Sequence, residues 1–185
     1  MVILTLERPH WIHSERPDDG SDQCLHGGSI FTVNGVNICD GRNGDWNVSA
    51  ASLYLLRTLS QNHTPGDEVC AENFFIPCCG HAVYPQGEGK PCLMIGCNSG
   101  KDPAITHRKD NIRIEWNGIQ ESVPFDEWRK AIIACAEAVF TVYESAVPRQ
   151  SVKDALEQEG WNVFWQEWHT VKKAHTCAST KSSHR

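Results

Sequence analysis

Alternating apolar and polar residues along the chain predict short strands that come in pairs. Two pairs surround Asn-Gly dipeptides: residues 29–33 and 36–39 around Asn34-Gly35, and residues 111–116 and 119–123 around Asn117-Gly118. This dipeptide suits a two-residue hairpin turn, because both central positions need a positive φ. The pattern therefore predicts two β-hairpins. Residues 2–6 and 105–107 are predicted to form further short strands, the first of them at a sheet edge.

A third hairpin is predicted between residues 76 and 97. Its two apolar runs lie on either side of residues 85–91, a loop rich in Gly and Pro. The segment contains four of the nine cysteines and one histidine, namely Cys78, Cys79, His81, Cys92 and Cys97. This hairpin therefore concentrates side chains that bind soft metals or act as nucleophiles.

Apolar residues three and four positions apart predict helices that pack against these strands. Residues 48–61 are apolar over a wide arc, which implies burial on most sides and therefore a central helix. From Phe125 to Ala146 the apolar positions recur without a break, and charged residues fill the other side. Pro148 follows directly. The second segment is therefore predicted to be a long amphipathic helix.

A last helix is predicted to begin at residues 151–154, where a carboxylate follows a serine by three positions. Gly160 is expected to interrupt or bend it. Its aromatic face consists of Trp161, Phe164, Trp165 and Trp168. These side chains either cover the sheet or form a protein-binding surface, and Trp165 and Trp168 are expected to be the more exposed.

Strands in hairpins, with helices set apart from them, indicate an α+β fold. We expect a mostly antiparallel sheet packed against the central helix and two longer C-terminal amphipathic helices. A chain of 185 residues suits a single domain. Residues 1–174 are predicted to form it, and residues 175–185, which are small and polar without periodicity, a mobile tail.

The charge is unevenly distributed. The chain has 17 basic and 23 acidic residues, and from His169 onward it has four basic residues and no acidic one. The remainder therefore carries 13 basic and 23 acidic residues, a net charge of −10. This disfavours nucleic acid as a partner and favours a basic protein. The mean hydropathy of −0.42 and the lack of a long apolar run or secretion signal predict a cytoplasmic protein that does not cross a membrane.

Two Cys-x-His pairs are candidates for a zinc site. Cys24 and His26 share the spacing of Cys79 and His81, and side chains two apart on a strand point to the same side. The two pairs together would complete a tetrahedral site, with Cys97 or Cys92 as an alternate ligand. The other interpretation is that these thiols are small core side chains. In that case no zinc is bound. No cofactor other than zinc is expected under either interpretation.

A cysteine-dependent enzyme is the alternative to a binding protein. Cys79 would be the nucleophile, and His81, His107 or His26 would be the base. On a strand, side chains two residues apart are rooted about 7 Å apart, so His81 is poorly placed to serve Cys79. Asp102 and His107 form a second possible acid and base pair.

In composition and element order the chain resembles the small acidic α+β immunity proteins that accompany bacterial polymorphic toxins. The resemblance implies an inhibitor that binds a cognate toxin and blocks its active site. The acidic body is compatible with a basic toxin as the partner. The leading hypothesis is therefore a protein-binding inhibitor, and the alternative is a zinc-binding or cysteine-dependent enzyme that uses the hairpin from Cys78 to Cys97.

Overall fold

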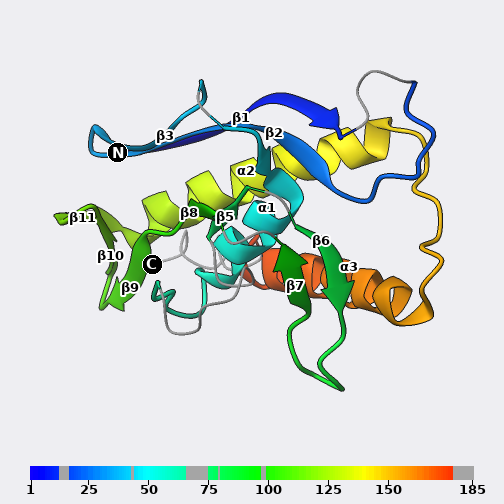
Figure 1. The fold of residues 1–185 in the computed structure, drawn as a ribbon. Coiled ribbons are helices and arrows are strands. Elements are labelled where there is room, and N and C mark those ends of the chain that lie inside the picture. The colour runs from blue at the N-terminus through cyan, green and yellow to red at the C-terminus, as the bar shows by residue number, and fades with distance from the viewer. Residues whose placement is uncertain (13–16, 43, 66–74, 79, 97–98, 177–185) are drawn as a thin grey trace.

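The computed structural model describes residues 1–12, 17–42, 44–65, 75–78, 80–96 and 99–176 (Figure 1). Within these ranges the chain forms three helices and four small sheets, and every strand pair is antiparallel. The prediction of an α+β fold with antiparallel hairpins and three helices is confirmed.

The first sheet has the order β1-β2-β3, with β4 also paired to β2. Its strands are β1 (Val2–Trp11), β2 (Leu25–Val33), β3 (Val36–Asp40) and β4 (Trp46–Asn47). Asn34 and Gly35 have φ values of 50° and 87°, as the predicted turn requires. The edge strand β1 extends well beyond residue 6. A register shift between Glu7 and His10 lets it continue, with Arg8 at a φ of 47°.

The other predicted hairpins are also confirmed. Strand β10 (Asn111–Trp116) lies between β9 (Ala104–Arg108) and β11 (Ile119–Pro124). Strand β6 (Gly80–Tyr84) pairs with β7 (Leu93–Gly96). A further short pair joins β5 (Ile76–Pro77) to β8 (Gly100–Lys101), so the chain segments that flank the β6–β7 hairpin also lie together.

Helix α1 (Val48–Arg57) occupies the centre of the molecule (Figure 1). Asn47 caps it by accepting a hydrogen bond from the amide of Ala50 at 3.0 Å. Every residue from Val48 to Leu56 is buried, because the helix contacts β2, β5 and both other helices. This agrees with the wide apolar arc, although the helix ends four residues earlier than predicted.

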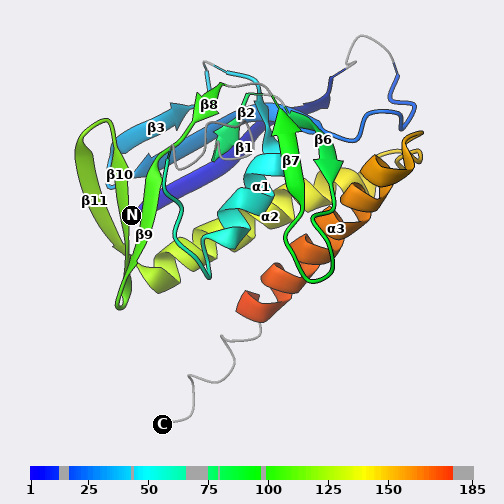
Figure 2. The same cartoon turned by 60° about the horizontal axis from the view of Figure 1, so that its bottom comes forward.

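Helix α2 (Phe125–Ser145) packs on β1 and α1, and helix α3 (Ala155–Thr176) packs on β6. Figure 2 shows the β6–β7 hairpin crossing α3. The prediction that Gly160 interrupts α3 is wrong, since the helix continues through it. A Cβ atom at Gly160 would lie 1.9 Å from the carbonyl oxygen of Val83, so glycine is present because β6 approaches closely.

Two details of α3 also differ from expectation. Asp154, not Ser151, caps the helix, and accepts a hydrogen bond from the amide of Glu157 at 2.9 Å. Trp168 was expected near the surface but is fully buried, and its Nε1 donates to Ser52 at 3.2 Å. Trp165 is half-buried. The helix runs two residues into the predicted tail, and residues 177–185 lie outside the described ranges.

No helix in the described ranges has both the length and the apolar character needed to span a bilayer.

Candidate functional site

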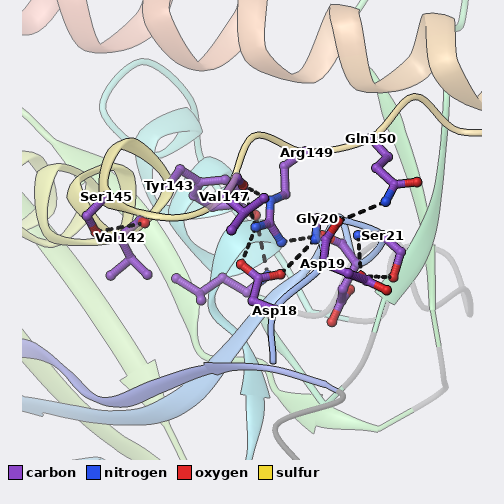
Figure 3. A network of polar contacts seen from close by, with 12 residues as sticks. Asp18, Asp19, Gly20, Ser21, Val142, Tyr143, Ser145, Val147, Arg149 and Gln150 are labelled. Atoms are coloured by element: carbon purple, nitrogen blue, oxygen red, sulfur yellow. Dashed lines mark hydrogen bonds and ion pairs between the residues drawn. The ribbon is translucent and has the colours of Figure 1, made fainter. Parts of the chain in front are cut away.

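The connection between α2 and α3 is bound to the loop that precedes β2. Arg149 makes an ion pair with Asp18 (Figure 3), and its Nη1 donates to the carbonyl oxygen of Asp22 at 3.0 Å. The guanidinium also lies over the ring of Trp11, 3.8 Å from its centre. The hydrogen bond from Arg149 lowers the pKa of the Asp18 carboxyl group. One arginine thus joins two distant chain segments.

Backbone contacts strengthen this junction. The amide of Gln150 donates to the carbonyl oxygen of Gly20 at 2.7 Å, and its side chain donates to that of Asp19 at 2.8 Å (Figure 3). In return, the side chain of Gln23 donates to the carbonyl oxygen of Gln150 at 2.8 Å. Gly20 has a φ of 81°, and a Cβ there would lie 2.4 Å from the carbonyl oxygen of Pro148. The close approach of the two segments therefore requires glycine.

Tyr143 also holds the loop that precedes β2. Its hydroxyl donates to the carbonyl oxygen of Gln23 at 2.8 Å and lies 2.6 Å from the hydroxyl of Ser49. Because the single phenol hydrogen is used on Gln23, Ser49 is the donor in the second contact. The amide of Leu25 also donates to the hydroxyl oxygens of Ser49 and Tyr143. Burial raises the pKa of Tyr143, so it stays a neutral donor.

We call the region formed by residues 17–24 and 144–157 the acidic corner. It contains six carboxylates, Asp18, Asp19, Asp22, Glu144, Asp154 and Glu157, and two cations, Arg149 and Lys153. The ion pair with Asp18 already occupies Arg149, which is 12% exposed. The corner therefore has a marked excess of negative charge.

A groove with a volume of about 500 Å³ opens at the acidic corner. It is lined by Ile12, Ser21, Asp22, Gln23, Cys24, His26, Gln150, Ser151, Val152, Lys153 and Glu157. The carboxylate of Asp22 is held in place, because it accepts the amides of Ile12 at 2.6 Å and Cys24 at 3.0 Å. Ile12 itself is exposed, as are Val147 and Leu156 in the corner.

The structure places Cys24 and His26, two of the predicted zinc ligands, in the wall of this groove. Both are buried, and Nδ1 of His26 lies 3.2 Å from the carbonyl oxygen of Cys24. Desolvation by burial lowers the pKa of His26. Among the described residues, no group of three or more His, Cys, Asp or Glu side chains is arranged to hold a metal ion. Cys79 and Cys97 lie outside the described residues, as does the side chain of His81.

Asp102 and His107, the second possible acid and base pair, each have a hydrogen-bond partner elsewhere in the chain. Oδ1 of Asp102 lies 2.5 Å from Nε2 of His63 and accepts the amide of Phe75 at 3.2 Å. His107 donates from Nε2 to the carbonyl oxygen of Thr58 at 2.8 Å. His63 also lines a cavity of about 210 Å³ beside α1. The sequence did not indicate the pair of His63 and Asp102, because the two residues are 39 positions apart and belong to no shared motif.

Three of the buried thiols in the described chain are poor nucleophiles. Burial raises the pKa of Cys39, Cys92 and Cys135 to about 12. Cys135 lies on the buried face of α2. These three side chains therefore act as core residues.

Comparison of this chain with protein-family models, with curated proteins and with solved structures gives no match.

Proposed function

We propose that this protein binds a basic protein partner at the acidic corner and thereby inhibits it. The observation that carries the proposal is the combination of excess carboxylates, exposed apolar side chains and a groove at one end of the molecule. A protein interface usually combines an apolar centre with a polar rim. Opposite charge on the partner would speed association and select against acidic competitors.

The position of Glu144 supports a binding role. It is exposed in the last turn of α2, which has no basic residue. The C-terminal end of a helix carries partial negative charge, so a carboxylate there weakens the helix. An acidic residue at this place does not serve helix stability, and attraction of a basic partner gives it a role.

The exposed apolar residues support the same proposal. Ile12 lines the groove, Val147 precedes the Arg149 junction, and Leu156 lies in the first turn of α3. All three belong to segments at the same end of the molecule (Figures 1 and 2). Apolar area beside charged groups supplies affinity, while the charges supply orientation.

The partner class we propose is a basic toxin, and the protein would act in the cytoplasm as its immunity protein. This extends the resemblance in composition and element order, and the negative charge of the first 168 residues agrees with it. A gene encoding a toxin is expected directly beside the gene for this chain. Its product should bind the purified protein.

Affinity capture from the source cell tests the proposal. The full chain should retain a basic protein at low salt, and the measured affinity should fall as ionic strength rises, because salt screens exposed charges. Capture of no protein, or an affinity that is indifferent to salt, would contradict the proposed inhibitor.

A further inference from the structure

His26 has an unused hydrogen-bonding atom in the wall of the groove. The residue is only 5% exposed, and Nδ1 lies 3.2 Å from the carbonyl oxygen of Cys24. A carbonyl oxygen can only accept, so Nδ1 carries the hydrogen and Nε2 of the neutral ring is an acceptor. Among the described residues the ring has no other hydrogen-bond partner. Nε2 can therefore accept a hydrogen bond from a donor that enters the groove lined by His26.

The other groups in the groove narrow the chemistry of that donor. Asp22 and Glu157 bring two carboxylates to the lining, against one cation from Lys153. An anionic ligand would be repelled by this arrangement. Ile12 and Val152 add apolar surface, which suits the aliphatic stem of a long side chain.

We infer that the groove receives an arginine side chain of the basic partner, an inference that rests on the proposed function. The guanidinium offers five N–H donors in a fixed plane and can bond an imidazole nitrogen and carboxylates together. A guanidinium is less strongly hydrated than an ammonium group, so its burial costs less. Lysine supplies a compact point charge and cannot span these acceptors equally well.

A titration with blocked arginine, N-acetyl-arginine-N-methylamide, tests the inference without a known partner. The His26 ring nitrogens of the full chain are followed by NMR, with the spectrum of His26→Gln used for assignment. We expect a saturable shift of the Nε2 signal. Blocked citrulline, which has nearly the same shape but no charge, and blocked lysine should bind at least about fivefold more weakly.

Two variants complete the test. His26→Leu removes the acceptor and Glu157→Gln removes one charge, and each should weaken binding of blocked arginine about tenfold, as loss of a charge-assisted hydrogen bond does. Glu115→Gln, at the opposite end of the molecule, should leave it unchanged. The inference is overturned if the wild-type protein gives no saturable shift, if citrulline or lysine binds as well as arginine, or if both groove variants bind normally.

This result is separable from the proposed function. A captured partner that binds His26→Leu as tightly as the wild-type protein, with a strong salt dependence, would overturn the arginine assignment and leave the inhibitor proposal standing. A saturable arginine site in a protein that captures no partner would support the site and contradict the inhibitor.

Discussion

The guanidinium of Arg149 lies over the indole of Trp11, 3.8 Å from the ring centre. These residues come from the connection between α2 and α3 and from the end of β1. The contact, together with the ion pair to Asp18, joins the chain segments that contribute Gln150 and Ile12 to the groove. The groove therefore depends on a junction between segments that are distant in sequence.

Arg149→Met should lower the free energy of unfolding by about 1 to 2 kcal/mol, because it leaves the Asp18 carboxylate without its cation and removes the contact with Trp11. Denaturant unfolding measures the change. Arg113→Met is the control, since Arg113 pairs with Glu115 at an exposed site and should cost less than about 0.5 kcal/mol. Equal losses in the two variants would contradict a special role for Arg149.

Gly160→Ala should destabilise the protein by about 2 kcal/mol or more, because the new methyl group would collide with the carbonyl oxygen of Val83. Helix propensity alone predicts the opposite sign, a gain of about 1 kcal/mol. Thermal unfolding decides between them. Thr170→Ala, at an exposed site of the same helix, should shift stability by less than about 0.5 kcal/mol. A more stable Gly160→Ala protein would show that α3 and β6 are not in close contact.

Cys39, Cys92 and Cys135 should resist alkylation in the folded protein. With a pKa of about 12, roughly one thiol in 10⁴ is ionised at pH 8, and burial blocks access as well. Iodoacetamide labelling followed by mass spectrometry measures the rates. In guanidinium chloride all nine cysteines should react. Rapid labelling of any of the three in the folded chain would contradict their burial.

Acidification from pH 7 to pH 5 should lower the free energy of unfolding. Burial lowers the pKa of His26, His169 and His175 from the ordinary value of 6.5. Below that pH the unfolded chain binds protons that the folded histidines do not, so stability falls as pH falls. His26→Gln removes one of these groups, so its free energy of unfolding should depend less steeply on pH. The two proteins are first compared at pH 8, and the change from that value is then measured for each. An unchanged slope in His26→Gln would count against a buried neutral imidazole.

Local patterns were sufficient to predict much of the fold. The turns at Asn34-Gly35 and Asn117-Gly118 depend on adjacent residues, and the face of α2 depends on spacings of three and four. Gly160 was misinterpreted because its reason lies in β6, far away in sequence. The length of β1 was underestimated because a register shift carries the strand past Pro9.

The site was only partly predictable. The spacing of Cys24 and His26 indicated two side chains on the same side of a strand. Both side chains line one groove, although β2 begins only at Leu25. Gln150 lines the groove and Arg149 precedes it in the chain, and the partners of both are carbonyl oxygens and a carboxylate in residues 18–22. Every residue has a backbone carbonyl, so the residue types do not show which carbonyl will accept a hydrogen bond. No pattern could therefore pair these segments.

The proposal that a basic partner binds at the acidic corner is tested most directly by neutralising carboxylates at the two ends of the molecule. One variant combines Glu144→Gln and Glu157→Gln in the acidic corner. The control combines Glu115→Gln and Glu121→Gln on the β10–β11 hairpin, at the opposite end in Figure 1, with the same change in net charge. Affinity for the captured partner is measured over a range of salt concentrations. The account predicts at least about tenfold weaker binding and a shallower salt dependence for the corner variant alone. Equal affinities for the two variants would contradict it.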